Sequence, residues 1–322
     1  LHGDVLQSDG AMSIGAGSLE IEGDYQIKKE TLLPDGTMDY SYSTGKLLMS
    51  NEMGYVFVGG DFLMWSKYSH SEYIRGGLLE IKGDFLQKEF YSPYYHNEDS
   101  EENFFASENH KVLLSGDRLQ VVNFESEKSK FNVLELTNSS AEGVKFESVL
   151  NANEIIPNDT AIEFYAGGIL GWKLTEDTVY NQDLYLEGGI LDLNGYSLII
   201  NGNLIQLSGT VHVNGGYLTI KGDYRIQSET ITDGTVIYGL SNGYLKMDND
   251  NDIVTVDGSF IPQSQYNHSG LLTKGALEIK GDFKQLLSKD VNFNPSGTHK
   301  VVLCGEALQK VSFGGSEYNR LS

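Results

Sequence analysis

The chain has 322 residues, of which 39% are hydrophobic and 11% aromatic. This is enough for a sizeable core and excludes a largely disordered protein. With 45 acidic and 23 basic residues the formal net charge is −22, which repels phosphate backbones and anionic headgroups and excludes nucleic acid as an expected partner. No segment has the apolar length of a transmembrane helix, so direct membrane insertion is not expected. A single cysteine, Cys304, excludes an internal disulfide framework, and we expect it to be a small buried side chain. The 37 glycines, 19 tyrosines and five prolines favour an all-β protein of short strands and tight turns.

A long internal repeat begins at residue 3. GDVLQSDGAMSIGAGSLEIEGDY aligns there with GNLIQLSGTVHVNGGYLTIKGDY, which begins at residue 202, an offset of 199 residues. LEIKGDF occurs in both copies, at 79–85 and 277–283. We therefore divide the chain into a first long repeat (3–148), intervening turns of the same kind (149–201) and a second, truncated repeat (202–322). Because the repeat pattern runs to both ends, we expect a fragment of a larger protein.

A shorter period of about twenty residues lies inside the long one. Segments such as LEIEG, YVFVGG, LTIKG and IVTVDG alternate apolar and polar residues and end at glycine. This is strand periodicity, and the spacing predicts a coil in which each turn, or rung, adds short strands to the same sheets.

The predicted fold over residues 1–322 is thus one continuous, elongated, single-stranded parallel β-solenoid. The handedness of parallel crossover connections favours a right-handed β-helix. About fifteen rungs stacked roughly 4.8 Å apart would give a rod on the order of 70 Å long. The alternative, antiparallel sandwiches, needs hairpin dipeptides at most turns, and the sequence has few.

Polar residues recur at fixed places in the rungs and are predicted to be structural. An aspartate after a corner glycine is expected to bond its own backbone and fix the turn; these residues are Asp4, Asp24, Asp61, Asp84, Asp117, Asp223 and Asp282. A second series is expected to stack as a ladder of side-chain amides: Gln7, Gln87, Gln120, Gln206, Gln285 and Gln309. The paired histidines His70 with His268 and His110 with His299 also repeat, which favours a structural role over a metal ligand or base.

Two segments break the repeat, and the first is 88–105, where the first copy holds about nine extra residues. It concentrates aromatic residues beside acidic ones: Phe90, Tyr91, Tyr94, Tyr95, Phe104 and Phe105. On a protruding loop these rings would contact a sugar or protein ligand. Equally, the rings could fold back and cover a neighbouring groove.

The second departure is the acidic run 247–258. Its alternate carboxylates could supply oxygen ligands to calcium; they are Asp248, Asp250, Asp252 and Asp257. Ile253 stands where a calcium-binding loop of the EF-hand type needs glycine, and the other interpretation is a solvated acidic turn. Calcium is the one cofactor that the sequence suggests.

The alternating GxLxIxGD rungs, the acidic composition and the near absence of cysteine resemble the β-helical stalks of bacterial surface proteins, the filamentous-haemagglutinin-like and autotransporter-like adhesins. The resemblance covers nearly the whole chain. It implies secretion, an extracellular or bacterial cell-surface location and a role in display or attachment, with neighbouring repeats of the parent chain as partners. It implies no site residue.

Two functions follow from the sequence. The first is a non-catalytic structural and adhesive module that displays loops for a cell-surface glycan or protein ligand. The alternative is a polysaccharide lyase or glycosidase, because parallel β-helices also carry such enzymes. An enzyme would need acidic and basic residues clustered outside the repeat pattern, whereas Arg75, Arg118, Arg225 and Arg320 are scattered. We therefore favour the first function and expect no catalytic residues.

Overall fold

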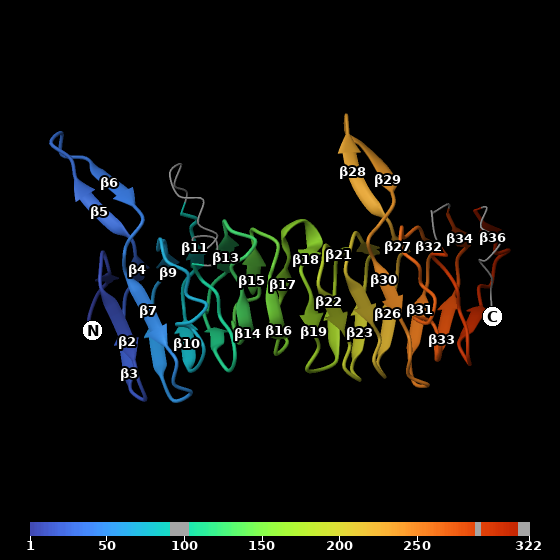
Figure 1. Ribbon diagram of the computed structural model, residues 1–322, viewed down its shortest axis with the longest axis horizontal. Coiled ribbons are helices and arrows are strands. Elements are labelled where there is room, and N and C mark those ends of the chain that lie inside the picture. The colour runs from blue at the N-terminus through green and yellow to red at the C-terminus, as the bar shows by residue number, and fades with distance from the viewer. Residues whose placement is uncertain (91–102, 287–290, 315–322) are drawn as a thin grey trace. The chain divides into compact units, whose positions relative to one another are not determined.

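The computed structural model describes residues 1–90, 103–286 and 291–314. Apart from one short 3-10 helix, Tyr165–Gly167, its regular elements are β-strands (Figure 1). The chain separates into two compact units, Leu1–Tyr165 and Ala166–Ser322. Each unit consists of parallel sheets whose neighbouring strands are successive passes of the chain.

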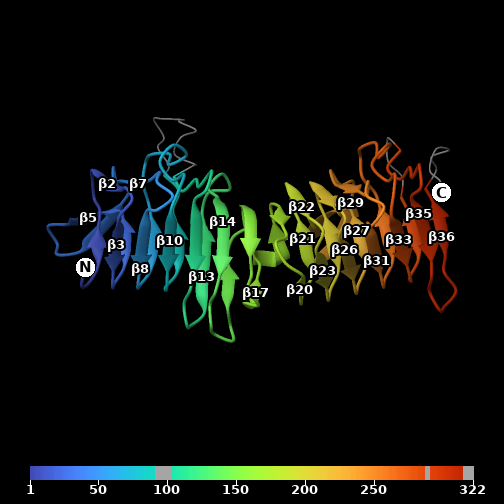
Figure 2. The ribbon, with the colours of Figure 1, turned by 90° about the horizontal axis from the view of Figure 1, so that it is seen from below.

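The first unit has two large parallel sheets and one small one (Figure 2). The seven-stranded sheet comprises, in spatial order, β1 (Val5–Leu6), β4 (Tyr25–Ile27), β9 (Phe62–Met64), β11 (Phe85–Gln87), β13 (Gln120–Phe124), β15 (Val144–Phe146) and β17 (Ile162–Glu163). The six-stranded sheet comprises β3 (Ser18–Ile21), β8 (Tyr55–Val58), β10 (Leu78–Ile81), β12 (Lys111–Leu114), β14 (Phe131–Leu136) and β16 (Ala152–Ile156). The small parallel sheet pairs β2 (Ala11–Ile14) with β7 (Lys46–Met49).

The second unit has three parallel sheets. The first contains β18 (Gly168–Ile169), β21 (Leu184–Leu186), β24 (Leu204–Gln206), β27 (Tyr224–Ile226), β32 (Phe260–Pro262), β34 (Phe283–Gln285) and β36 (Val311–Phe313). The second contains β20 (Thr178–Tyr180), β23 (Ser197–Ile200), β26 (Tyr217–Ile220), β31 (Ile253–Val256), β33 (Ala276–Ile279) and β35 (Lys300–Leu303). The third contains β19 (Trp172–Lys173), β22 (Ile190–Asp192), β25 (Thr210–His212) and β30 (Tyr244–Lys246).

The alternating sequence explains this arrangement. In β8, Val56 and Val58 are fully buried, whereas the intervening residues point outward. Val56 lies in register with Leu79 of β10, so apolar residues from successive rungs cover one another and enclose the interior. The predicted all-β parallel solenoid is confirmed.

The aligned residues of the long repeat occupy corresponding places in the two units. In the first unit the rings of Tyr25 and Phe62 lie 5.6 Å apart and those of Phe62 and Phe85 5.5 Å apart. In the second unit the corresponding residues are Tyr224, Phe260 and Phe283, with centroid distances of 5.2 and 6.0 Å between successive rings. Each unit thus has an aromatic column at its centre.

Each unit also carries an antiparallel hairpin that the sequence analysis did not predict. The first hairpin joins β5 (Lys29–Leu32) to β6 (Met38–Ser41), and the second joins β28 (Ser228–Thr232) to β29 (Thr235–Gly239). Both extend away from the sheets of their own unit (Figure 1). Their turns contain the repeated DGT, with Gly36 at φ 84° and Gly234 at φ 73°, backbone conformations that suit glycine.

Cys304 differs from its prediction. It is exposed, and it lies directly after β35 with Sγ 3.6 Å from the carbonyl oxygen of Ile279. The expectation of a small buried side chain was wrong, because the strand before it is itself largely exposed, with three of the four residues of β35 exposed.

Candidate functional site

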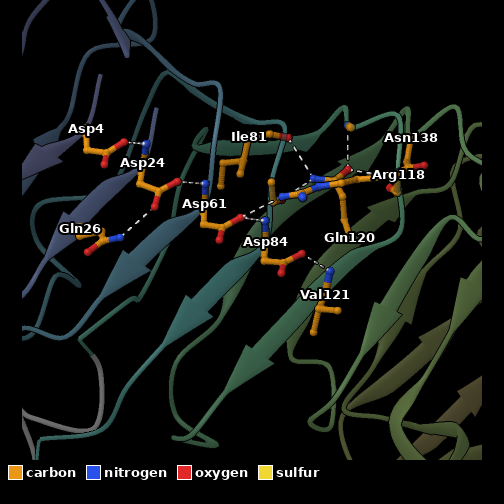
Figure 3. A network of polar contacts seen from close by, with 12 residues as sticks. Asp4, Asp24, Gln26, Asp61, Ile81, Asp84, Arg118, Gln120, Val121 and Asn138 are labelled. Carbon is orange, nitrogen blue, oxygen red and sulfur yellow. Dashed lines mark hydrogen bonds and ion pairs between the residues drawn. The ribbon is translucent and has the colours of Figure 1, made fainter. Parts of the chain in front are cut away.

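The corner aspartates of the first unit form a ladder of hydrogen bonds between rungs (Figure 3). Asp4 Oδ1 accepts a bond from the backbone N–H of Asp24 at 2.9 Å, and Asp24 Oδ1 accepts one from Asp61 at 2.8 Å. The series continues from Asp61 to the N–H of Asp84, and from Asp84 to the N–H of Val121, both at 2.8 Å. For these four aspartates the structural role is confirmed, but the expected partner was wrong: each carboxylate holds the next rung. Asp117 is exposed, and a structural role for it stays a prediction.

The second unit builds the same ladder from different side chains. Asp183 accepts from the N–H of Asn203 at 2.7 Å, and Asn203 accepts from that of Asp223 at 2.8 Å. Asp223 then accepts from Ser259 at 2.8 Å, and Ser259 Oγ from Asp282 at 3.3 Å. Aspartate, asparagine and serine share a short side chain with an accepting oxygen, so the position requires an acceptor and not a charge.

The pKa values of two ladder carboxylates shift in opposite directions because their surroundings differ. Partial burial, with Asp61 and Glu147 as lesser causes, raises the pKa of Asp84 despite the bond from Val121. The backbone N–H of Lys310 and the ammonium of Lys284 lower the pKa of Asp282. The two copies of LEIKGDF therefore do not form equivalent acid sites.

The repeated glutamines do not stack as the predicted amide ladder. Gln120 is fully buried and its Nε2 donates to the carbonyl oxygens of Ile81 and Gly83, at 3.1 and 2.6 Å. Its Oε1 accepts from the N–H of Gly116 at 2.8 Å and from Nδ2 of Asn138 at 2.9 Å (Figure 3). The side-chain amide of Gln120 thus hydrogen-bonds backbone groups of neighbouring turns and the side chain of Asn138. These bonds pair buried polar atoms that would otherwise have no partner.

The repeated histidines His70, His110, His268 and His299 are all buried. Burial lowers the pKa of His70, His110 and His268 to about 4, against weaker opposing hydrogen bonds to the backbone. His70 Nε2 accepts from the N–H of Leu47 at 3.2 Å, and the ring of His110 bonds the carbonyl oxygen of Gly76 at 2.9 Å. These contacts support the predicted structural role.

The four aspartates of the acidic run have separate partners. Asp252 is fully buried, where it accepts from the N–H groups of Gly215 and Asn249 at 2.6 and 3.0 Å. The other three carboxylates pair with different cations: Asp248 with His212 and Lys246, Asp250 with Lys274, and Asp257 with Lys221 and Lys280. Across residues 1–90, 103–286 and 291–314 no group of three or more metal-ligating side chains could hold a metal ion. The calcium interpretation therefore gains no support from the described residues and stays a prediction.

The six aromatic residues of 88–105 have three different outcomes. Tyr91, Tyr94 and Tyr95 lie outside the described residues. Phe104 is fully buried, with its ring 4.8 Å from that of Phe85, so it cannot contact a ligand and belongs to the core. Phe105 is half-buried, with the Lys130 ammonium 4.5 Å from its ring centroid.

Phe90 joins an aromatic group at the base of the first hairpin. Its ring lies 4.3 Å from that of Tyr42, which is 41% exposed. The two residues before Phe90 contact Trp65. The carbonyl oxygen of Glu89 accepts from Trp65 Nε1 at 3.1 Å, and the Lys88 ammonium lies 5.1 Å from the Trp65 ring centroid. The ligand role of Phe90 and Phe105 remains a prediction, because both retain partial exposure.

The two hairpins expose corresponding apolar faces. In the first, Glu30 lies opposite Tyr40 and Leu32 opposite Met38. In the second, the corresponding cross-strand pairs are Glu229 with Tyr238 and Ile231 with Val236. Leu32 is 67% exposed and Ile231 70%, and both tyrosines carry a cation near the ring, from Lys28 and Arg225.

A hollow of about 260 Å³ lies on the first unit, between β9 and β10 in sequence. It is lined by Tyr68, Ser69, Ser71, Glu72 and Tyr73. The Lys46 ammonium lies 4.2 Å from the Tyr68 ring centroid and 5.0 Å from that of Tyr73, and donates to Tyr73 Oη at 3.3 Å. The sequence patterns did not predict this group, and the second copy has different residues at several of its positions.

A local difference between the two copies of the repeat could have pointed to the residues around this hollow. Isolated bridges place Met49 beside Ile74 and Met247 beside Leu272, which fixes the correspondence between the two copies here. The second copy has Tyr244, Gly270 and Leu271 in place of Lys46, Glu72 and Tyr73 of the first. Tyr244 stacks on Tyr266 there, with centroids 5.4 Å apart. The hollow's chemistry therefore belongs to the first unit alone.

Comparison with known proteins does not assign the chain to a group. No protein-family model matches it, and no curated protein or solved structure gives a significant match. Within the described ranges, no helix is long and apolar enough to cross a membrane.

Proposed function

We propose that this chain is a non-catalytic structural and adhesive module of a large secreted or bacterial cell-surface repeat protein. Its rungs form a rigid stalk, and its hairpins and loops are displayed for attachment to a surface glycan or protein. The parent chain's neighbouring repeats are its natural partners along the stalk.

One observation carries the proposal. The polar residues that recur through the chain, which would be the first candidates for chemistry, are engaged in holding one rung to the next. Exposed apolar and aromatic side chains lie instead at the two hairpins, and two tyrosines line the hollow of the first unit. Aromatic and apolar side chains at exposed positions suit binding more than proton transfer.

The net charge of the chain limits the class of ligand that it can bind. A net charge of −22 repels polyanions over the whole surface unless a cation bridges the two. The four aspartates first considered for calcium are already paired with lysine, histidine or backbone groups. A neutral glycan or a neutral to basic protein surface is therefore the better ligand.

The test is adhesion of the labelled chain to cells and to an array of immobilised glycans. The comparison variant has residues 91–102 replaced by a Gly-Ser linker of equal length, which leaves the buried Phe104 in place. We expect the intact chain to bind, with no release of reducing or unsaturated sugar from any bound polysaccharide. Absence of binding, or release of sugar, would overturn the proposed function; equal binding by the variant would remove the replaced segment from it.

A further inference from the structure

We infer that the hollow of the first unit binds one neutral sugar ring of a surface glycan. The inference rests on the proposed function and names the ligand class and residues. It starts from the two tyrosines, Tyr68 and Tyr73, which line the hollow together. Aromatic rings present a flat apolar surface to the C–H face of a sugar, and their hydroxyls supply polar contacts at the edge.

The remaining lining residues suit sugar hydroxyls. The hydroxyls of Ser69 and Ser71 hydrogen-bond each other at 3.0 Å, and Ser69 Oγ also accepts from the N–H of Ser71 at 3.2 Å, so the two residues form a polar pair in the lining of the hollow. Glu72 is exposed, and within the described residues no ion pair engages its carboxylate, which offers acceptors for hydroxyl donors. The hollow thus combines apolar faces with a few convergent polar groups, as small-molecule sites do.

Lys46 orients one of these groups. Its ammonium donates to Tyr73 Oη at 3.3 Å, which leaves the tyrosine's own proton for an acceptor on the ligand. The same ammonium lies over both rings and helps to fix their positions. Tyr73 also makes an edge contact with the buried His70, with centroids 5.9 Å apart. The tyrosine is therefore held before a ligand arrives.

Size and charge limit the ligand to one neutral ring. The hollow's 260 Å³ is below the roughly 300 Å³ at which pockets for drug-sized ligands begin. An acidic sugar would meet Glu72 and the −22 charge of the chain. A neutral hexose or N-acetylhexosamine unit avoids that repulsion and can still use every polar group.

The experiment is a ligand-observed NMR titration of the whole chain with methyl glycosides of neutral hexoses and N-acetylhexosamines. Glucuronic acid and sialic acid are the charged comparators. We expect millimolar binding of at least one neutral glycoside. Tyr73→Leu, which introduces the residue found at Leu271 of the second unit, should weaken the affinity for that glycoside at least tenfold. Glu72→Gln, a substitution at an exposed position, should weaken the affinity several-fold.

Tyr266→Leu is the matched control, because it removes the second unit's counterpart of Tyr68 and should leave binding unchanged. Binding that survives both Tyr73→Leu and Glu72→Gln, preference for a charged sugar, or no sugar binding would overturn the inference. Adhesion of the chain to cells through another part of its surface would leave the proposed function standing, so the two failures can be told apart.

Discussion

At the scale of single residues, the side chains that look most like catalytic groups are the ones that assemble the fold. Asp61 illustrates this: its Oδ1 accepts from the N–H of Asp84, one rung further along. Arg118 also approaches it at 3.4 Å, but this pair is largely exposed and contributes little. The important interaction is therefore the one with the backbone, which asparagine also makes at position 203.

Replacing Asp61 tests this. Asp61→Ala leaves the N–H of Asp84 without its acceptor in a partly buried corner and should lower the free energy of unfolding by about 1–2 kcal/mol. Asp61→Asn keeps an accepting oxygen and should cost less than about 0.5 kcal/mol. Urea denaturation followed by circular dichroism measures both. Equal losses in the two variants would mean that the charge, not the hydrogen bond, matters.

The partners of these residues could not be read from the sequence. The alternation of LEIKGDF was enough to predict a strand, a corner glycine and a structural aspartate. The acceptors of Gln120, however, lie 37 and 39 residues earlier in the chain, and that separation depends on how many residues each rung takes. The burial of Phe104 likewise depends on the space beside Phe85, which no local pattern encodes.

At the scale of elements, the rungs and the hairpins are stabilised differently. A rung strand such as β10 pairs on both sides and buries Leu79 and Ile81 completely. The first hairpin is an isolated two-stranded ribbon, and β5 and β6 show no fully buried residue. Two-stranded ribbons are marginal by themselves, so the hairpins add little to stability and are the elements available for contact.

These hairpins were not predicted from the sequence because only part of the hairpin pattern is present. The turn dipeptide Asp-Gly is present at Asp35 and Asp233, but the flanking segments lack a clear apolar and polar alternation. Exposure of both faces removes the pressure for that alternation. The strands that enclose the core were predictable because burial of one face imposes an alternation of apolar and polar residues.

Shortening the first hairpin tests its independence. Replacing residues 30–40 by Asn-Gly, a two-residue loop between the paired Lys29 and Ser41, should lower the free energy of unfolding by less than about 1 kcal/mol. The control is Leu79→Ala, which opens a cavity in the core and should cost about 2–5 kcal/mol. Thermal and urea unfolding measure both variants. A hairpin variant as unstable as the control would show that the hairpin supports the rungs.

At the scale of the whole molecule, the buried histidines make stability depend on pH. His70 and His110 in the first unit and His268 in the second have pKa values of about 4 when folded. The ordinary pKa of histidine is about 6.5. Between these values the unfolded chain binds protons that the folded chain does not, so the free energy of unfolding falls as the pH falls.

We therefore expect stability to decline between pH 6.5 and pH 4, before most carboxylates titrate. Asp84, whose pKa is raised by burial, opposes the trend but is a single partly buried group. Urea unfolding at intervals of half a pH unit measures the slope, and His110→Gln should flatten it. Constant or increasing stability on acidification would contradict this account of the histidines.

The place where the hairpins leave the sheets also has a use in protein engineering. In the first unit the hairpin segment begins after β4 and ends at Ser43, whose N–H donates to the carbonyl oxygen of Trp65. Both ends of this segment are therefore held by the rungs. In the second unit the excursion begins after β27 and ends at Ser241, which is held in the same way by Gln263. Two equivalent sites in one chain therefore offer graft points for foreign epitopes or small domains, with no rung pairing to be redesigned.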